Sequence, residues 1–432
     1  MTPSDLTSRV PGADAGAHDA LDRAGGNPGA LHATLGRLLT PLLARLLRSV
    51  RSGTLVVELP GGKRLAGRGV HPGPQATLVL HRWRPLLRLL LRGDIGFAAS
   101  YRDGDWSTPD LPALLEVALR NDERWSGTLD GAWPVRLRHR LAHLLHANTR
   151  RGSRHNIAFH YDMGNAFYAQ WLDPALIYSS ALYAHPQQTL EDAQAHKLQR
   201  VLDLLDLRDG DAVLEVGCGW GALAVAMARA GAAQVTGVTL STEQLAHAQE
   251  RLAQEGLAQQ VDLRLQDYRD VQGRFQRIVS IEMMEAVGER YWPTYFDMLR
   301  ERLAPGGKAV LQVITMADAH FPHYRRNADF IQHFIFPGGM LPSVGAMQAQ
   351  AQRAGLTLRR EVSFGLSYAA TLAEWRTRFH RAWPQIEPLG YDAAFRRLWD
   401  YYLCYCEAGF RTGRVDVGLF TLAHAGDATA PR

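Results

Sequence analysis

The stretch "AVLEVGCGWGALAVAMARAG", residues 212–231, joins a short apolar run to an alanine-rich run through three glycines at alternate positions. The apolar run predicts a buried strand, and the alanine-rich run predicts a helix. A glycine-rich turn between a strand and a helix lets the backbone approach a ligand closely, beside the outward-pointing N–H groups of the helix end. The stretch therefore predicts a ligand-binding turn, and its spacing indicates which ligand.

Two features of this turn argue against a dinucleotide. A dinucleotide-binding turn has the spacing G-x-G-x-x-G, whereas Gly217, Gly219 and Gly221 have the spacing G-x-G-x-G. The acidic residue that would hold a ribose about twenty positions further on is replaced by "GVTLS" (237–241). Glu215 would repel a pyrophosphate but attract the ammonium and sulfonium charges of S-adenosylmethionine. The turn therefore favours S-adenosylmethionine.

Strand-like and helix-like segments alternate from the turn onwards. Such alternation predicts an α/β fold with a doubly wound, mostly parallel sheet, whose ligand lies at the carboxyl ends of the strands. Two later stretches, 318–352 and 370–411, are expected to cap that edge, and "LAPGGK" is expected to be a turn before the last parallel strand. The expected strands are 212–217, 234–240, 261–267, 277–283 and 308–314, and the expected helices are 219–230, 242–255 and 291–303.

Length and composition predict two domains and a cytoplasmic protein. The chain of 432 residues exceeds one average domain, and its net charge of +5 favours an anionic surface as a partner. We find no secretory signal or membrane-spanning run, and the three cysteines allow no metal-ligand or disulfide spacing, so we expect no metal site. The expected parts are a disordered tail (1–30), a small α+β N-terminal domain (31–121), a basic helical linker (122–158), the catalytic α/β domain (159–424) and a tail (425–432).

Further motifs accompany the glycine turn at the ends of the later strands. "LQDY" (265–268), "IEMMEAVG" (281–288) and "LAPGG" (303–307) make residues 190–320 resemble the class I S-adenosylmethionine-dependent methyltransferases, which have a Rossmann-like fold. Other stretches are similar to the cyclopropane-fatty-acyl-phospholipid synthase family in particular. They are "HNIAFHYDMGNAFYAQWLD" (155–173), "YSSALY" (178–183), "GVTLSTEQ" (237–244), "FIFPGGMLPS" (334–343) and "FGLSYAATLAEWRTRF" (364–379).

The resemblance implies a reaction and a cofactor site. The reaction would be transfer of a methyl group from S-adenosylmethionine to the cis double bond of an unsaturated phospholipid acyl chain, forming a cyclopropane through a carbocation. Aromatic rings in "RYWPTYF" (290–296), Phe336, Tyr368 and Trp375 could stabilise that cation, although core packing is the ordinary role of each. The residues expected to line the cofactor site are Tyr178, Ser179, Glu215, Gly217, Gly219, Gly221, Thr239, Gln244, Asp267 and Tyr268.

The same resemblance implies a bicarbonate ion as the base that removes a proton to close the ring. In the family a cysteine, a glutamate, a histidine, an isoleucine backbone and a tyrosine hold this ion. Glu285, Ile314 and Tyr368 match that set, whereas Ser180 replaces the cysteine and Gln312 replaces the histidine. Because a hydroxyl and an amide still donate hydrogen bonds, we expect the anion site to persist, and its loss is the alternative.

Three other functions remain open at this point. The same fold could leave a methyl-branched or methylene chain without ring closure, bind lipid without catalysis, or methylate a nucleic acid or a soluble small molecule. We find no nucleic-acid-binding module and expect no nucleic acid partner. We also expect peripheral contact with the anionic inner face of the membrane, and we leave a homodimer open. A solvated helix is the alternative role for the arginines that would make this contact: Arg136, Arg138, Arg140, Arg150, Arg151 and Arg154.

Overall fold

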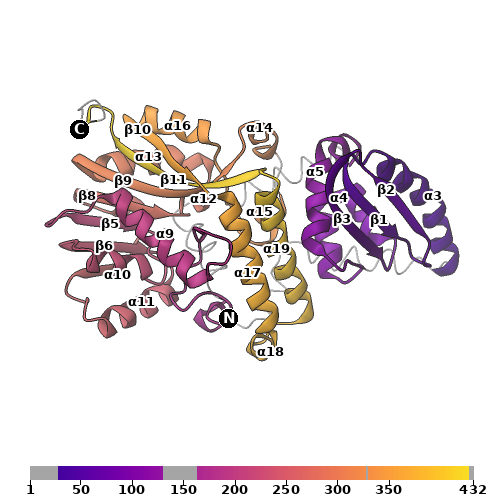
Figure 1. Ribbon diagram of the computed structural model, residues 1–432, viewed down its shortest axis with the longest axis horizontal. Coiled ribbons are helices and arrows are strands. Elements are labelled where there is room, and N and C mark those ends of the chain that lie inside the picture. The colour runs from indigo at the N-terminus through magenta and orange to yellow at the C-terminus, as the bar shows by residue number, and fades with distance from the viewer. Residues whose placement is uncertain (1–27, 130–162, 327–328, 428–432) are drawn as a thin grey trace. The chain divides into compact units, whose positions relative to one another are not determined.

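The structure is a computed structural model that describes residues 28–129, 163–326 and 329–427 (Figure 1). The described residues form two compact units. Unit 1 contains residues 28–129, 329–335 and 384–412, and unit 2 contains residues 163–326, 336–383 and 413–427. No helix in the described parts of the chain is long and apolar enough to cross a membrane.

Unit 1 contains the predicted small α+β fold. In β1 every second residue is buried, which is the pattern of a strand with one face on a core. β1 pairs antiparallel with β2 through the Pro-Gly-Gly turn and parallel with β3, in the order β2-β1-β3-β4. The expected tail ends earlier than residue 30, since α3 already begins at Pro28. The elements are α3 (Pro28–Arg48), β1 (Ser52–Glu58), β2 (Arg64–Arg68), β3 (His71–Leu80), α4 (Arg84–Arg102), β4 (Trp106–Ser107) and α5 (Leu111–Leu129).

Two segments from much later in the sequence also belong to unit 1. They contain α15 (Phe330–Phe334), η3 (Glu387–Leu389) and α19 (Ala393–Arg411). The Tyr101 hydroxyl in α4 donates to Asp400 Oδ2 at 3.0 Å, and the two rings of Tyr101 and Tyr401 are 5.8 Å apart. Although the sequence analysis placed residues 370–411 together as a cap, α19 therefore packs on α4.

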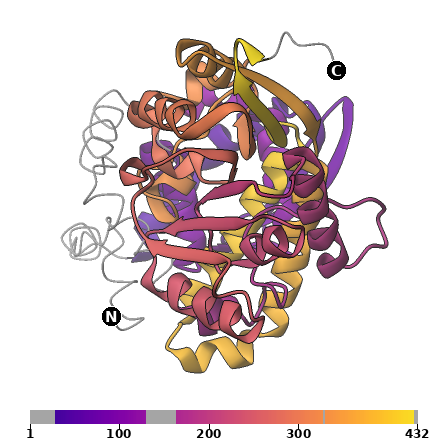
Figure 2. The same cartoon turned by 90° about the vertical axis from the view of Figure 1, so that its left-hand side faces the viewer.

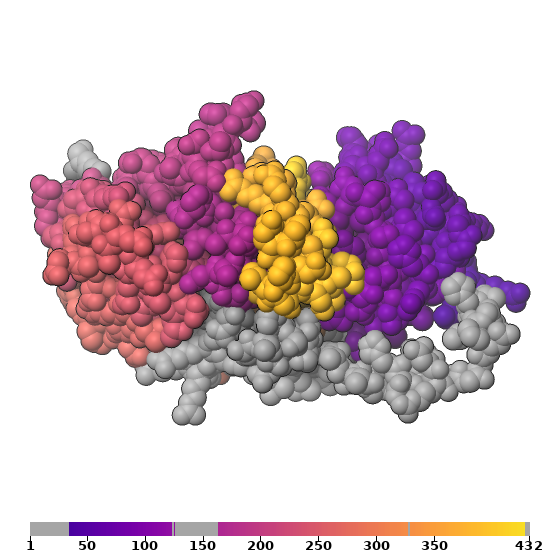
Figure 3. All heavy atoms as spheres, turned by 90° about the horizontal axis from the view of Figure 1, so that it is seen from below, coloured from indigo at the N-terminus to yellow at the C-terminus, as the bar shows by residue number. Residues whose placement is uncertain are grey.

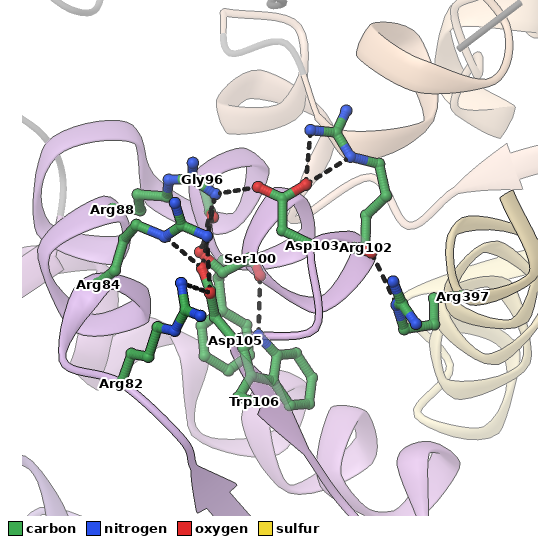
Figure 4. A network of polar contacts seen from close by, with 11 residues as sticks. Arg82, Arg84, Arg88, Gly96, Ser100, Arg102, Asp103, Asp105, Trp106 and Arg397 are labelled. Atoms are coloured by element: carbon green, nitrogen blue, oxygen red, sulfur yellow. Dashed lines mark hydrogen bonds and ion pairs between the residues drawn. The ribbon is translucent and has the colours of Figure 1, made fainter. Parts of the chain in front are cut away.

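A buried ion pair fastens α4 to the segment that follows it (Figure 4). Arg84 donates to both carboxylate oxygens of Asp105, at 2.6 and 2.7 Å, and Asp105 is only 1% exposed. Arg88 donates to Asp103 at 2.7 Å, and Arg397 of α19 donates to the Arg102 carbonyl at 2.7 Å. The arginines thereby tie α4 to β4 and to α19.

Unit 2 is built on a seven-stranded sheet in the order β10-β11-β9-β8-β5-β6-β7. The pairs from β9 through β7 are parallel and the two pairs involving β11 are antiparallel, which confirms the predicted mostly parallel, Rossmann-like sheet. Figure 2 shows β11, in yellow, at the upper edge of this unit. The strands are β5 (Ala212–Val216), β6 (Gln234–Thr239), β7 (Val261–Leu265), β8 (Phe275–Ile281), β9 (Leu303–Met316), β10 (Leu356–Ser363) and β11 (Val415–His424).

The helices of unit 2 cover the sheet. α9 packs on β8 and β9, α10 and α11 pack on β6, and α13 and α16 share a buried core with β5, β8 and β9. The helices are α8 (Asn165–Tyr168), α9 (Leu190–Leu205), α10 (Ala222–Arg229), α11 (Thr242–Gln254), α12 (Met284–Val287), α13 (Trp292–Arg302), α14 (Phe321–Tyr324), α16 (Val344–Arg353) and α17 (Gly365–Arg381), with short turns η1 (Tyr268–Asp270) and η2 (Glu289–Tyr291). The short helix α18 (Trp383–Ile386) begins at the last residue of the segment 336–383, and its other residues belong to unit 1.

Two expectations about unit 2 were wrong. α16 lies in the predicted cap 318–352, but its Met347 and Ala351, one helical turn apart, are buried in the sheet core, so α16 is a layer of the fold. The "LAPGG" stretch is part of β9, because Leu303 already pairs with Phe275. The register then shifts to Arg277 and Lys308, so the glycines form a bulge within the strand.

The carboxyl ends of the parallel strands carry several polar residues that the sequence analysis selected, and also Glu282, which it did not select. Glu215 is in β5, Thr239 ends β6, and Asp267 follows β7 by two residues. Glu282 directly follows β8, and Gln312 lies in β9, where it is opposite the last residue of β8. The fold therefore brings these side chains to one edge of the sheet.

Candidate active site

The glycine turn has the backbone conformation that its sequence predicts. Gly217, Gly219 and Gly221 have φ values of 86°, 51° and 82°, which glycine adopts without steric cost. The amides of Gly217 and Cys218 both donate to the Val238 carbonyl, at 2.9 and 3.0 Å, so the turn is held against the neighbouring strand. Gly217 is nevertheless exposed, which leaves its backbone open to a ligand.

Glu215, just before this turn, is buried and incompletely satisfied. The side chain is 3% exposed, and its Oε2 has no hydrogen-bond partner among the described residues. Burial raises the pKa of its carboxyl to about 8, and the Lys197 ammonium opposes this shift. Because an unsatisfied buried carboxylate is costly, a ligand cation at this position would be strongly favoured. This fits the expected cofactor ammonium group.

The polar residues at the ends of β6 and β7 form hydrogen bonds with neighbouring residues of the chain. The Thr239 hydroxyl donates to the side-chain oxygen Oε1 of Gln244 at 3.0 Å. The Ser241 hydroxyl caps α11 by accepting from the Gln244 backbone amide. The Asp267 carboxylate accepts from Arg269 at 2.6 and 2.8 Å. Three of the predicted cofactor residues are therefore buried near the edge of the sheet that carries the glycine turn: Thr239, Gln244 and Asp267.

An aromatic cluster extends from the glycine turn to Tyr368. The ring of Trp220 lies 5.3 Å from that of Tyr168, which lies 5.3 Å from Tyr178. Trp375 lies 5.4 Å from Tyr178 and 6.1 Å from Tyr368. Two of the rings expected near a cation, Tyr368 and Trp375, therefore belong to one cluster.

Three other expected rings have a structural role instead. Trp292, Tyr295 and Phe296 lie in the hydrophobic core beneath the sheet and are at most 2% exposed. Tyr268, predicted at the cofactor site, places its ring 5.7 Å from that of Tyr295. Core packing, the ordinary role of an aromatic residue, accounts for the "RYWPTYF" motif.

Glu282 is a site residue that the sequence analysis missed. Its Oε1 accepts from the Ser180 backbone amide at 2.9 Å and from Gln312 Nε2 at 2.7 Å. Its Oε2 accepts from the Tyr368 hydroxyl at 2.7 Å. Three of the five residues predicted to hold an anion therefore donate to a carboxylate of the chain itself. The signal was present in "IEMMEAVG", which contains two acidic residues three positions apart.

Glu285 lies beside Glu282 and accepts a hydrogen bond from the Ile314 amide. Its Oε2 is buried and has no hydrogen-bond partner in the described part of the chain. Desolvation and then the charge of Glu282 raise the pKa of Glu285 to about 8. Desolvation also raises the pKa of Glu282, but the bonds from Ser180, Tyr368 and Gln312 oppose it, so Glu282 is the better stabilised anion of the two.

The Ser180 hydroxyl does not take the place expected for the family's thiol. It donates to the Ala181 carbonyl at 2.9 Å, and only the Ser180 backbone amide contacts Glu282. Gln312 likewise directs its amide nitrogen to Glu282. The Ser180 backbone and the Gln312 side chain thus both donate to a carboxylate of the chain itself.

A buried lysine that the sequence analysis also missed interacts through its charge with both Glu215 and Glu282. Lys197 is 1% exposed and donates from Nζ to the Ser179 hydroxyl at 2.9 Å. Burial lowers the pKa of its ammonium to about 8, opposed by the charges of Glu282, Asp173 and Glu215. The sequence signal was a lysine on the apolar face of a helix, four residues before the buried Val201.

Known proteins resemble the chain at the level of sequence. Residues 148–420 match the family model described as mycolic acid cyclopropane synthetase. The tuberculostearic acid methyltransferase UfaA1 of Mycobacterium tuberculosis is 40% identical over 360 residues, which are 81% of this chain and 84% of that protein. The cyclopropane-fatty-acyl-phospholipid synthase of Escherichia coli is 37% identical over 329 residues, which are 75% of this chain and 81% of that protein.

Solved structures also resemble a large part of the chain. The mycolic acid cyclopropane synthase CmaA1, crystallised with SAH and CTAB, superposes with a TM-score of 0.59 at 31% identity, covering 62% of this chain and 97% of that one. Coclaurine N-methyltransferase, at 18% identity and a TM-score of 0.57, shares the fold. The family match, the two relatives and the glycine turn agree. The chain therefore belongs to the mycolic acid cyclopropane synthetase family of S-adenosylmethionine-dependent methyltransferases.

Proposed function

We propose that the protein transfers the methyl group of S-adenosylmethionine to a carbon of the cis double bond in an unsaturated phospholipid acyl chain. The observation that carries the proposal is the placement of Glu282, Glu285 and Tyr368 at the same sheet edge as the glycine turn. The names of both relatives, a tuberculostearic acid methyltransferase and a cyclopropane-fatty-acyl-phospholipid synthase, support an acyl chain as the substrate.

The cofactor would lie across the glycine turn. S-adenosylmethionine supplies a methyl group on a sulfonium, and the crystal structure of a relative contains the demethylated cofactor, SAH. In this chain the unsatisfied Glu215 oxygen would accept from its ammonium, and the exposed backbone of Gly217 would let it approach. The other residues proposed to line its site are Tyr178, Ser179, Gly219, Gly221, Thr239, Gln244, Asp267 and Tyr268.

An alkene is a weak nucleophile, so the site must align the double bond and exclude water. The double-bond electron pair forms the bond to the methyl carbon, and the carbon–sulfur electrons leave with sulfur. The neighbouring chain carbon becomes cationic, and water would capture it in an open site. The rings of Trp375 and Tyr368 offer π faces to a cation, each worth about 0.5–2 kcal/mol. Loss of a proton then ends the reaction.

Which proton leaves determines the product. Removal of a proton from the transferred methyl closes a cyclopropane, which is the product we propose. Removal of a chain proton instead leaves a methyl-branched chain with a double bond. A methylene forms when a hydride first moves from the methylated carbon to the cationic carbon and the transferred methyl then loses a proton. This second candidate is supported by the relative named as a tuberculostearic acid methyltransferase.

We also propose that the protein works at the inner face of the membrane from the cytoplasm. The arginines predicted to contact anionic lipid, Arg136 to Arg154, lie outside the described residues, which are the coloured parts of Figure 3. A homodimer remains a further proposal. No group of three or more His, Cys, Asp or Glu side chains that could hold a metal occurs among the residues the structure describes.

Mass spectrometry of the lipids of a bacterial host that lacks such an enzyme tests the proposed function. Expression of the protein should add one CH2 unit to unsaturated acyl chains, and fragmentation should distinguish a ring from a branch. The Gly217→Val variant should leave the lipids unchanged, because the valine side chain obstructs the cofactor. Unchanged lipids with the wild-type protein, when it binds S-adenosylmethionine, would reject an acyl chain as the substrate.

A further inference from the structure

We propose that Glu282 is the proton acceptor of this reaction, a built-in carboxylate at the position where the family resemblance implies a bound bicarbonate. The inference rests on the proposed function and names the base for it. It stands on the hydrogen bonds around Glu282, on the charges near it and on its backbone conformation.

The donors expected to hold a bicarbonate already have acceptors. Ser180 N, Gln312 Nε2 and Tyr368 Oη all donate to Glu282, and the Ile314 amide donates to Glu285. The second N–H of the Gln312 amide is directed at the Ser180 carbonyl, at 3.4 Å. An added anion would have to displace the Glu282 carboxylate from these donors. The chain therefore supplies the anion for which its donor set is arranged.

The charges around the site lead to the same conclusion. A bicarbonate here would lie against two carboxylates, and like charges at a shared site oppose ionisation. Lys197 is the cation whose charge acts on Glu282, and it also acts on Glu215 at the cofactor end. One ionised carboxylate, Glu282, balances this lysine, whereas an additional anion would have no cation to offset it among the described residues.

The backbone holds Glu282 in an uncommon conformation. Its φ is +50°, a left-handed value that is strained for a non-glycine residue, and residues held in this conformation cluster at functional sites. The Glu282 amide donates to the Gln312 carbonyl at 2.8 Å, which fixes this conformation at the end of β8. Gln312 is fully buried, but Glu282 remains partly exposed. The backbone and the three donors thus hold its carboxylate in one position.

The proton transfer balances without another reactant. A Glu282 oxygen takes a proton from the transferred methyl, and the electrons of that C–H bond form the second ring bond to the cationic carbon. Glu282 becomes a neutral carboxylic acid, and the substrate returns to neutral charge. The acid releases its proton to water after the product leaves, which restores the carboxylate.

Replacement of Glu282 by glycine gives a sharp test, because glycine accepts the left-handed backbone and leaves a space the size of the carboxylate. The assay is turnover in bicarbonate-free buffer with unsaturated phospholipid vesicles, and calorimetry measures S-adenosylmethionine affinity separately. Glu282→Gly should bind the cofactor normally and lose about 10²- to 10⁴-fold in turnover. Glu282→Gln, which keeps the shape and loses the charge, should lose a similar factor. Glu301→Gln on the exposed side of α13 is the matched control.

Added anions then separate a base from a structural support. Formate, acetate and bicarbonate should restore turnover to Glu282→Gly, and the restored rate should increase with the basicity of the anion. The wild type should not respond to bicarbonate. A wild type that requires bicarbonate, a Glu282→Gly variant with undiminished turnover, or a rescue independent of basicity would overturn the inference. The proposed function would survive each of these results, because it fails only if the wild type methylates no acyl chain.

Discussion

A side chain added at Gly217 should prevent cofactor binding without unfolding the protein. A Cβ at this position would lie 3.1 Å from Met283 Cγ, and the φ of 86° disfavours a branched residue. We expect Gly217→Val to abolish S-adenosylmethionine binding in calorimetry. Gly256→Val is the control, because Gly256 has a φ of 71° with no atom within 4 Å of its added Cβ. Undiminished affinity in Gly217→Val would place the cofactor elsewhere.

Glu285 should give folding a pH dependence of definite sign. Its pKa is raised in the folded chain from 4.5 to about 8, so the folded state holds a proton that the unfolded state has lost between these values. The stability that this group contributes is present below about pH 4 and is lost as the pH rises through about 8. Glu285→Gln, which carries no charge at any pH, should therefore raise the melting temperature relative to wild type at high pH and little at low pH.

Thermal unfolding of the cofactor-free protein across this pH range measures the effect. Glu301→Gln removes an exposed carboxylate from α13 and serves as the control. A melting-temperature difference that stays constant with pH would show that Glu285 is ionised throughout. Glu285→Gln should still bind cofactor in calorimetry, because the glutamine amide oxygen can accept from the Ile314 backbone amide as the carboxylate does.

At the scale of elements, the Arg84–Asp105 pair should hold α4 in place. Asp105 is 1% exposed, so loss of both bonds from Arg84 would leave a buried carboxylate poorly satisfied. Arg84→Met should lower the free energy of unfolding by about 1–3 kcal/mol in chemical denaturation. Arg64→Met removes an exposed pair with Glu58 and should cost under about 1 kcal/mol. Equal losses in the two variants would contradict the structural role of the buried pair.

The elements also show which features could be predicted from local sequence. The glycine turn and the strands around it were predictable, since spacing and apolar runs are local signals. α16 was not, because a short stretch whose apolar residues are mostly alanines does not reveal that Met347 and Ala351 enter a core. The packing of α19 on α4 depends on side chains almost 300 positions apart, such as Tyr101 and Asp400, and no periodicity reports it.

In the candidate site, too, residues within a motif could be predicted, whereas contacts between distant parts of the chain could not. Glu215 and the glycines lie in one motif, and the resemblance located Ser180, Gln312 and Tyr368. Their common partner could not be found in this way, because Glu282 is 102 positions from Ser180 in sequence and meets it only in the folded chain. The sequence analysis therefore grouped Ser180, Gln312 and Tyr368 but missed Glu282, which accepts hydrogen bonds from all three, and it expected the Ser180 hydroxyl where the backbone amide is the donor.

At the scale of the whole molecule, the basic segment should direct the protein to anionic lipid. Exposed charges are screened within about 10 Å at 0.1 M salt, so vesicle binding should weaken as salt rises. Replacing Arg136, Arg138, Arg140, Arg150, Arg151 and Arg154 by glutamine should reduce binding to anionic vesicles in a sedimentation assay. Equal binding of the wild type to neutral and anionic vesicles would remove the electrostatic argument.

A labelled methyl group shows whether the protein methylates a carbon of an acyl chain. The purified protein would receive S-adenosylmethionine with a trideuterated methyl group and vesicles of an unsaturated phospholipid, and mass spectrometry would follow the label. We predict that the label enters the acyl chain and retains two of its three deuterium atoms, because the base removes the third as the ring closes. Label in the headgroup, or none in the lipid while the cofactor is bound, would contradict the account.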